Sequence, residues 1–341
     1  MKKDEILRLI SRLNDYQNED ENTGTSYFSY AMGTLINLRV NTQRSQAKEV
    51  IQEVLVLIDR LEKIMSYYGI ASQVSQINKQ AGKAWVSVDP ELFLVIKESH
   101  RYARLTNGLF NITVAALISL WQHSGKCGQI PSHSFIEDAL TKVDYEDILI
   151  DEQNRKIKLR QEGQKIDLGG IAKGYTANQV IQYYWQKGLH SAMINLGGNV
   201  ALFGKRKDGK LWQVGIQDPD RERGQCLATI AVSDTSVVTS GDYERFFLED
   251  DRYYHHILNP FTGYPADSKL RSVTVIHPDA MLADVLSTTL FISGLEKGIK
   301  MLRCFADVEV IMVDKEKNIY LSSSLLEQFQ LIEKGYSIFQ F

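Results

Sequence analysis

The stretch SVTVIHPDAMLADVLSTTLFISG, residues 272–294, places a strand and a helix in immediate succession. Residues 272–276 are rich in β-branched side chains and predict a strand. Residues 280–292 predict a helix that Asp279 caps at its N-terminus and Gly294 ends. Because this helix is otherwise apolar, a charged side chain within it needs a partner.

The rest of the chain contains segments with strand composition and segments with helical periodicity. Strands are predicted over residues 30–40, 148–150, 156–159, 191–196, 211–216, 228–232, 252–258 and 308–313. Helices are predicted over residues 46–68, 90–105 and 176–185. The two kinds of segment do not alternate in a strict βαβ rhythm, and several strands are joined by hairpin-like turns. The sequence therefore predicts an α+β fold of mixed, mostly antiparallel sheets flanked by helices.

No internal repeat, low-complexity tract or Pro/Gly/Ser linker divides the chain, so a single domain is expected. Residues 4–14 have helical spacing, and the polar residues 18–25 follow them. We expect an N-terminal helix and connector over residues 1–25 and one folded domain over residues 26–341. Within that domain, residues 201–216 are expected to form a hairpin around a charged turn.

The composition is that of a globular protein with no nucleic-acid partner. Of the 341 residues, 44% are hydrophobic and 24% are charged, and the formal net charge is -3. A protein that neutralises the phosphates of DNA or RNA would be basic, so this balance argues against such a partner. No run reaches the roughly 18 apolar residues of a membrane span, and the N-terminus shows no signal-peptide pattern. A cytoplasmic protein without a membrane anchor is expected.

Asp284 and Thr288 are the first candidate functional pair. Asp284 lies between apolar neighbours, where an unpaired carboxylate would be costly. Thr288 is four residues later and therefore lies on the same helix face. Both offer hard oxygen ligands of the kind that Mg²⁺ prefers. The alternative is that Thr288 bonds its own backbone carbonyl one turn earlier while Asp284 pairs with a basic side chain.

The segment IDLGGIAKGY, residues 166–175, is a second candidate site. Gly169, Gly170 and Gly174 surround Lys173 just before a predicted helix. Glycines let the backbone approach a ligand closely, and a helix N-terminus with a lysine favours an anion. The alternative is a glycine-rich turn that carries a solvated lysine.

The segment YYHHILNPFTGYP, residues 253–265, contains adjacent histidines. Strand alternation places residues 254, 256 and 258 on one face and residues 253, 255 and 257 on the other. At most one of His255 and His256 is therefore expected in a given pocket. Histidine is suited to proton transfer near neutral pH, although a structural histidine is the alternative.

Taken in order, eight segments resemble the ApbE family, the FAD:protein FMN transferases. They are MGTLINLRV from residue 32, SYYGIASQVSQIN from 66, NGLFNITVAALISLW from 107, IDLGGIAKGY from 166, INLGGNV from 194, TSGDYERFF from 239, HHILNPFTGYP from 255 and SVTVIHPDAMLADVLSTT from 272. Alone, NLGGN and TSGD read as turns or bulges. Together the segments cover the body of the chain, so the resemblance implies one ApbE-like domain.

The resemblance also implies a magnesium site and an FAD site. The metal ligands would be Asp284 and Thr288, with Ser287 nearby and the backbone carbonyl of Gly170. The flavin contacts would be Met32, Tyr68, Leu109, Phe110, Asn111, Asp167, Lys173 and Ile257. His256 would activate the acceptor hydroxyl. In the mechanism expected from this, Lys173 would stabilise negative charge on the phosphate oxygens, and Asp284 would act by holding the metal. Two positions depart from the family pattern: Asn111 stands where Asp is frequent, and Ser287 where an acidic or small residue is common.

The activity implied is cleavage of FAD at its pyrophosphate, with the FMN half attached through a phosphoester to a hydroxyl of another protein and AMP released. The partner would be an acceptor flavoprotein whose FMN-binding domain carries a target Thr or Ser. One alternative is an FAD pyrophosphatase, in which water replaces the acceptor and gives FMN and AMP. Another is a non-catalytic protein that binds or delivers FAD. A hydroxyl-activating base such as His256 favours catalysis over storage.

Overall fold

The computed structural model describes residues 10, 24–127, 129–244, 246–249 and 252–341. Apart from residue 10, the expected N-terminal helix over residues 4–14 lies outside these residues, as does most of the connector that follows. Among the residues described, no helix combines the length and apolar character that crossing a bilayer requires.

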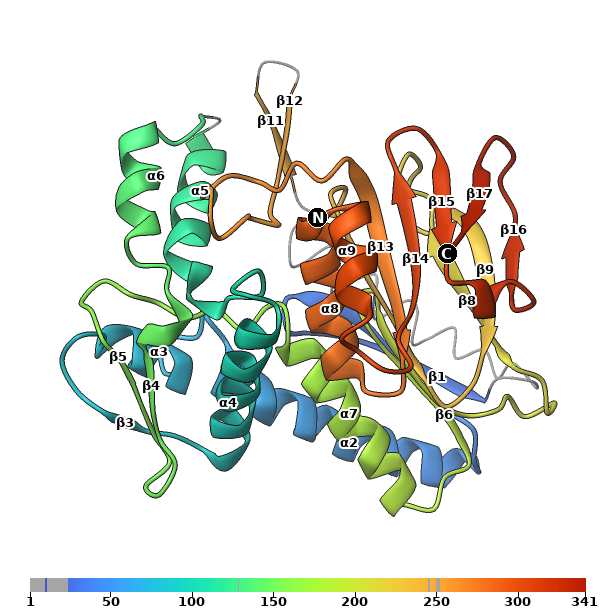
Figure 1. The fold of residues 1–341 in the computed structure, drawn as a ribbon. Coiled ribbons are helices and arrows are strands. Elements are labelled where there is room, and N and C mark those ends of the chain that lie inside the picture. The colour runs from blue at the N-terminus through green and yellow to red at the C-terminus, as the bar shows by residue number, and fades with distance from the viewer. Residues whose placement is uncertain (1–9, 11–23, 128, 245, 250–251) are drawn as a thin grey trace.

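The centre of the molecule is a nine-stranded sheet in the order β1-β2-β6-β7-β10-β13-β14-β15-β17 (Figure 1). Its strands are β1 (Thr25–Ala31), β2 (Thr34–Val40), β6 (Ser191–Leu196), β7 (Asn199–Gly204), β10 (Ser236–Gly241), β13 (Leu270–His277), β14 (Glu309–Asp314), β15 (Asn318–Leu321) and β17 (Ser337–Gln340). Within the described residues the neighbouring strands pair antiparallel, except that β15 and β17 are parallel. The expectation of an α+β fold with mostly antiparallel sheets is confirmed.

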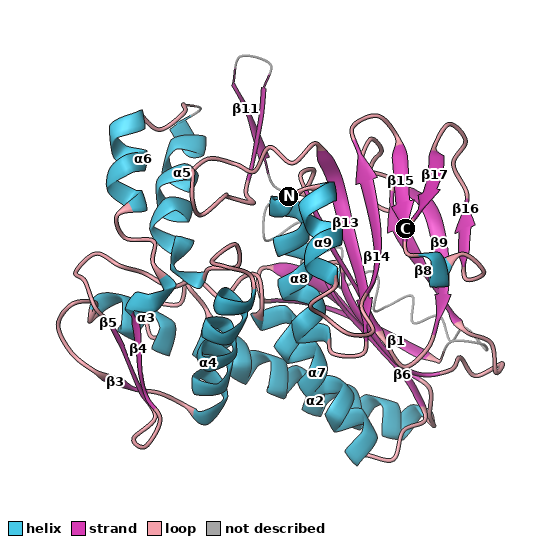
Figure 2. Cartoon of the chain, viewed as in Figure 1, coloured by secondary structure: helices cyan, strands magenta, loops and turns pink. Residues whose placement is uncertain are grey.

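One face of this sheet is covered by helices (Figure 2). Helix α2 (Arg44–Met65) and helix α7 (Ala172–Gln186) pack on the β2–β7 side, where the shared core includes Ile36, Ile194 and Tyr184. Helix α8 (Ala280–Ser293) packs on β10 and β13, and α9 (Leu295–Leu302) follows it. Helices α7 and α8 also contact each other, so this face brings residues about 110 positions apart together.

The other face of the sheet packs on a three-stranded sheet of β8 (Trp212–Gln217), β9 (Cys226–Val232) and β16 (Phe329–Leu331). The alternation along the central strands explains both layers. In β13, Val273 and Val275 join the core against α8, whereas Ile276 joins the core against β9. Central strands such as β13 are therefore buried on both faces and form the middle layer.

The remaining elements lie beside these layers. They are β3 (Val86–Ser87), β4 (Ile148–Asp151) and β5 (Lys156–Leu159) in one small sheet, the hairpin of β11 (Phe246–Glu249) and β12 (Arg252–His255), the helices α3 (Gln73–Lys79), α4 (Pro90–Leu105), α5 (Ala115–Cys127) and α6 (His133–Leu140), and the 3-10 turns η1 (Ile112–Val114), η2 (Tyr145–Asp147) and η3 (Ser323–Leu325).

Three details differ from the sequence expectation. The strand expected over residues 30–40 is a hairpin, because Met32 and Gly33 adopt φ angles of 52° and 74° and reverse the chain. The hairpin expected over residues 201–216 is wrong, because β7 pairs with β6 and β10 whereas β8 pairs with β9 in the other sheet. Strand β12 ends at His255, so the alternation expected up to residue 258 stops there.

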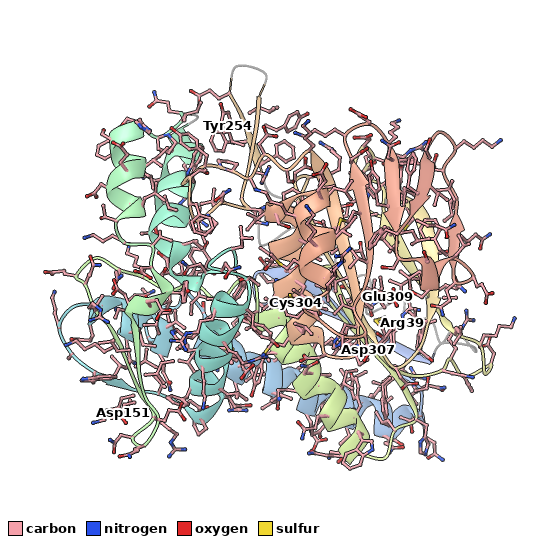
Figure 3. The ribbon with its side chains drawn as sticks, in the orientation of Figure 1. Arg39, Asp151, Tyr254, Cys304, Asp307 and Glu309 are labelled. Atoms are coloured by element: carbon pink, nitrogen blue, oxygen red, sulfur yellow. The ribbon has the colours of Figure 1, made fainter. Side chains whose placement is uncertain are left out.

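The β11–β12 hairpin projects from the body (Figure 1), and its aromatic side chains contact Trp121 of α5. Its Tyr254, labelled in Figure 3, stacks on Trp121 with ring centroids 5.7 Å apart. Phe247 stacks on Tyr254 at 5.3 Å, and Trp121 donates a hydrogen bond to the carbonyl of Gly263 at 2.7 Å. These contacts fix the base of the hairpin, where the two histidines lie.

Candidate active site

Gly174 allows the close approach of α7 and α8. A Cβ atom added to Gly174 would lie 2.3 Å from the carbonyl oxygen of Ala280, a separation that no side chain tolerates. The same residue donates its backbone N–H to Asp284 Oδ2 at 3.0 Å. The last glycine of IDLGGIAKGY is therefore required by helix packing, and it brings the first turn of α7 to the Asp284 carboxylate.

Asp284 is buried with 4% of its surface exposed and is incompletely paired. Its Oδ1 lies 3.7 Å from Lys173 Nζ, which is longer than an ordinary hydrogen bond. Burial raises the pKa of Asp284, while Lys173 and the Gly174 N–H act in the opposite direction. The pairing with a basic side chain that the sequence offered as an alternative is therefore present, but it leaves the carboxylate at a raised pKa.

Asn199 supports the same conclusion from the sheet side. The residue is 1% exposed, and neither its amide oxygen nor its amide nitrogen has a hydrogen-bond partner in the described part of the chain. The Asn199 amide nonetheless acts on the Asp284 carboxylate and lowers its pKa. Unsatisfied buried polar atoms beside a carboxylate are what a site for an additional polar group would leave.

The hydroxyl of Thr288 faces the same region as Asp284. Thr288 Oγ1 lies 3.2 Å from Ser240 Oγ, and a Cβ added to Gly170 would lie 3.7 Å from it. The neighbouring Thr289 instead donates to the carbonyl of Val285, one turn earlier, at 2.7 Å. A hydroxyl bond back to the carbonyl one turn earlier, which the sequence offered as the alternative for Thr288, is therefore made by Thr289. The hydroxyl oxygen of Thr288 instead lies between Ser240 of β10 and the glycine turn at Gly170.

The glycine turn before α7 is held by its own side chains. Asp167 Oδ1 accepts the backbone N–H of Gly169 at 2.6 Å, and Lys173 Nζ donates to the Gly169 carbonyl at 2.8 Å. A Cβ added to Gly170 would lie 3.3 Å from the ring of Phe110. The structure therefore brings together Asp167, Gly170 and Lys173 from the turn with Phe110 on one side and the α8 pair on the other.

Ser287 and Ser240 form a second pair of hydroxyls behind Thr288. Ser287 Oγ donates to the carbonyl of Asp284 at 2.9 Å and lies 2.9 Å from Ser240 Oγ. Ser240 belongs to the TSGD segment, which sequence reasoning treated as a turn or bulge. No local pattern could have singled it out, because its contacts join residues 47 and 48 positions apart.

The two histidines differ sharply. His255 is buried, its Nε2 donates to the carbonyl of Ala266 at 3.0 Å, and its Nδ1 accepts the N–H of Ile257 at 3.3 Å. Both ring nitrogens are therefore engaged, and burial lowers the pKa of this imidazole. His256 is exposed. His256 is therefore the histidine that solvent can reach, and the expectation that at most one of the two serves a given pocket stays a prediction.

The remaining expected flavin contacts are more dispersed. Asn111 is buried and accepts two hydrogen bonds from Thr113, from its N–H at 2.9 Å and its hydroxyl at 2.6 Å. Tyr68 is 66% exposed and accepts a hydrogen bond from Gln122 at 2.5 Å. Met32 lies in the β1–β2 turn against the core that contains Phe110, and Leu109 is half-buried beside Phe110. Ile257 is buried against α8.

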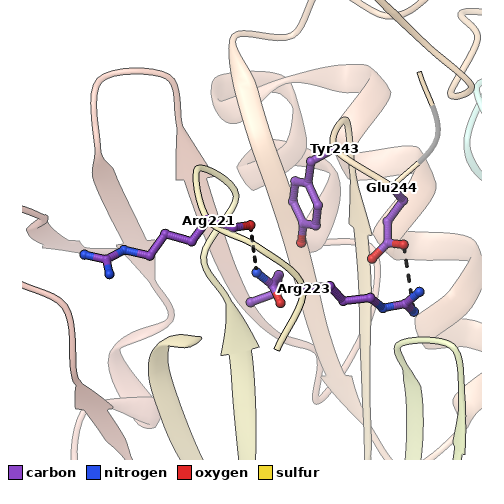
Figure 4. Close-up of a pocket in the computed structure, with 5 residues that line it drawn as sticks. Arg221, Arg223, Tyr243 and Glu244 are labelled. Carbon is purple, nitrogen blue, oxygen red and sulfur yellow. Dashed lines mark hydrogen bonds and ion pairs between the residues drawn. The ribbon is translucent and has the colours of Figure 1, made fainter. Parts of the chain in front are cut away.

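Two described cavities lie away from these residues. One, of about 220 Å³, is lined by Gln217, Arg221, Arg223, Tyr243 and Glu244 (Figure 4). Its arginines are already paired: Arg221 lies 2.7 Å from Glu333, and Arg223 lies 4.0 Å from Glu244. The other, of about 480 Å³, lies between α9 and β14–β15. Neither cavity is lined by a residue of the expected metal or flavin site.

The oxygen atoms around Asp284 fit a hard divalent cation. In the described residues no three His, Cys, Asp or Glu side chains gather at one place, so a site here must combine one carboxylate with hydroxyl and carbonyl oxygens. Asp284, Thr288 and the Gly170 turn supply that set, and Mg²⁺ accepts such ligands together with substrate phosphates. The donors present are compatible with the expected metal.

Comparison with known proteins gives consistent relatives. A curated FAD:protein FMN transferase from Klebsiella pneumoniae (strain 342) is 34% identical over 318 residues, which cover 93% of this chain and 98% of the relative. A second protein of that name, from Treponema pallidum (strain Nichols), is 32% identical over 317 residues, covering 89% and 88%.

Solved structures agree with these relatives. The crystal structure of the ApbE protein from Thermotoga maritima has a TM-score of 0.82 at 33% identity and covers 89% of this chain and 98% of that one. The flavin transferase ApbE from Vibrio cholerae has a TM-score of 0.79 at 26% identity, covering 90% and 99%. The ApbE family model matches residues 32–312. These matches show that the chain belongs to the ApbE family.

Proposed function

We propose that this protein is an FAD:protein FMN transferase that uses Mg²⁺. It cleaves FAD at the pyrophosphate, joins FMN through a phosphoester to a Thr or Ser of an acceptor flavoprotein, and releases AMP. The observation that carries this proposal is the buried, incompletely paired carboxylate of Asp284 beside the Thr288 hydroxyl and the glycine turn of Lys173. The family and the names of its curated members supply the reaction.

In this proposal Asp284, Thr288 and the carbonyl of Gly170 hold the metal. Bound there, Mg²⁺ would neutralise charge on the diphosphate and on the departing AMP. The glycine turn is a suitable neighbour, because the amides at the start of α7 and the Lys173 ammonium favour phosphate oxygens. Lys173 is already oriented by the Gly169 carbonyl.

His256 is proposed as the general base. It takes the proton from the acceptor hydroxyl, whose oxygen attacks the phosphorus of the FMN half. The bond between that phosphorus and the bridging oxygen breaks, and AMP leaves with the electron pair. An exposed histidine suits this role because the second substrate is a protein that arrives from solvent. His255 holds the backbone in place instead, since both its nitrogens are engaged.

The flavin half is proposed to contact Met32, Tyr68, Leu109, Phe110, Asn111, Asp167, Lys173 and Ile257. Asp167, Lys173 and Phe110 contact the glycine turn directly. Asn111 contributes an uncharged side chain where the family often has Asp. The acceptor is proposed to be an FMN-binding domain of another protein. The cytoplasmic location expected for the transferase itself stays a prediction.

The test is intact-mass analysis of an acceptor domain incubated with the purified protein, FAD and Mg²⁺. The expected result is an added mass of one FMN, which a variant of the acceptor lacking the target hydroxyl does not gain. Release of AMP and FMN without an adduct would replace the proposal by a pyrophosphatase. Tight FAD binding with neither product would replace it by a flavin carrier.

A further inference from the structure

Four oxygen atoms connect β10 to α8 in a continuous chain. Thr288 Oγ1 lies 3.2 Å from Ser240 Oγ, Ser240 Oγ lies 2.9 Å from Ser287 Oγ, and Ser287 Oγ lies 2.9 Å from the Asp284 carbonyl. Ser287 is fully buried, and Ser240 and Thr288 are half-buried. The chain therefore runs from the inside of α8 to the hydroxyl that faces the candidate cation site.

The direction of every hydrogen bond in this chain follows from the carbonyl at its end. A carbonyl oxygen only accepts, so the single hydroxyl hydrogen of Ser287 is donated to Asp284. Ser287 must then accept from Ser240, which uses the single hydrogen of Ser240. Ser240 has only lone pairs left for its other neighbour, so Thr288 donates to Ser240. Both lone pairs of Thr288 remain for another partner.

That orientation matters for a metal ligand. A hydroxyl binds a cation through a lone pair, and its hydrogen must point elsewhere. Thr289 shows the competing state, since its hydroxyl turns back to the carbonyl of Val285 at 2.7 Å. Thr288 has the same freedom one residue earlier on the helix, and the Ser240 acceptor draws its hydrogen toward the sheet.

We propose that Ser240 is a positioning residue for the cation site: through the relay Thr288–Ser240–Ser287–Asp284 carbonyl, it holds the Thr288 lone pairs toward the metal. On this proposal Ser287 acts behind Thr288 and does not bind the metal directly. The inference rests on the proposed function, because the cation is the one that the transfer reaction uses. It extends that function by assigning the TSGD segment a role in orienting a metal ligand, separate from binding the flavin.

The test compares Ser240→Ala with Ser240→Thr and with Thr239→Val. Thr239 is a matched control, because its side chain lies on the opposite face of β10 and exchanges a hydroxyl contact of 2.8 Å with Thr274. For each protein, FAD binding is followed by flavin fluorescence while Mg²⁺ is titrated, without acceptor, and is repeated in EDTA. Melting temperatures in EDTA report whether each variant folds.

The expected result is that Ser240→Ala raises the Mg²⁺ concentration for half-maximal effect about tenfold, the lower end for residues that orient metal ligands. FAD binding in EDTA should stay at the wild-type level, Ser240→Thr should restore the Mg²⁺ response, and Thr239→Val should match wild type. The relay is overturned if Ser240→Ala and Thr239→Val give the same Mg²⁺ titration, or if Ser240→Ala weakens FAD binding equally in EDTA. If the wild-type protein transfers FMN and responds to Mg²⁺, and Ser240→Ala gives the same Mg²⁺ titration as wild type, the relay alone is refuted. A wild-type protein with neither transfer nor Mg²⁺ response refutes the proposed function as well.

Discussion

Two carboxyl groups in this protein are buried to nearly the same extent but differ in how many hydrogen bonds they accept. Asp147, at the end of η2, is 6% exposed, and Asp284 on α8 is 4% exposed. Asp147 receives Arg160 Nε at 2.7 Å, Gln161 Nε2 at 2.7 Å and Gln164 Nε2 at 2.8 Å. Asp284 receives one backbone N–H at 3.0 Å and a lysine at 3.7 Å.

The difference teaches how to separate a structural carboxylate from a functional one. The chain completes the hydrogen bonding of Asp147 with three side chains, so this group needs nothing further. It leaves Asp284 short of donors, with Asn199 unpaired beside it and the pKa raised by burial. A cation supplied from outside would complete the second site, and the comparison therefore predicts opposite consequences of mutation in the two regions.

The largest expected effect is that of Asp284→Asn on catalysis. Loss of the carboxylate should lower FMN transfer by more than about 1,000-fold, because a bound metal contributes several kcal/mol to the transition state. The melting temperature in EDTA should stay the same or rise. Since the folded pKa of Asp284 is raised, its stabilising contribution is present only at low pH and is lost as the pH rises, so the neutral amide removes a cost. If Asp284→Asn transfers FMN at nearly the wild-type rate, the assignment of Asp284 as the functional carboxylate is contradicted.

His256→Asn should come next, with a fall in transfer rate of about 100-fold or more, the usual contribution of a general base. This pair of histidines repeats the comparison, since the chain engages both nitrogens of His255 and leaves His256 at the surface. The matched variant His255→Asn should lower the melting temperature, while His256→Asn should not. Single-turnover rates and thermal melts of the two variants, measured side by side, decide the point; equal rates would remove His256 from the mechanism.

Asp147→Asn should affect stability and leave the chemistry alone. The amide nitrogen would face the donors of Gln161 and Gln164, leaving buried groups unsatisfied at a cost of about 3 kcal/mol. Urea unfolding in EDTA measures this loss, and FMN transfer well below the melting temperature should be retained. A variant that is fully stable but inactive would invert the roles assigned to the two carboxylates.

Asp242 is an intermediate case and gives the smallest effect. Its Oδ2 lies 3.1 Å from Arg271 Nη1, but its Oδ1 has no partner in the described part of the chain. Burial raises its pKa from 3.8 to about 6, with Arg271 opposing. The folded state thus holds this proton more tightly than the unfolded one, and the stability that it contributes is present below pH 3.8 and lost as the pH rises through about 6. Asp242→Asn should therefore reduce the fall in melting temperature between pH 5 and 8; an identical pH profile would contradict the assignment.

Local patterns predicted much of the fold. Helix α4 occupies the expected residues 90–105, and β5 and β6 occupy 156–159 and 191–196, because apolar periodicity and β-branched runs are local signals. The hairpin at Met32 was missed because Met32 is a non-glycine residue with a positive φ, which composition does not mark. The predicted pairing of β8 with the strand before it is wrong, because β8 pairs with β9, the strand that follows it.

The sequence by itself determined the family, the α+β class and the spacing of Asp284 and Thr288, since these depend on residue identity and helical period. Only the tertiary structure decided that Gly174 brings α7 against α8, that Thr288 turns to Ser240, and that His255 is sealed while His256 is accessible. The physical reason is that hydrogen-bond satisfaction and burial are properties of the packed chain. They join residues that are distant in sequence, and no local pattern carries that information.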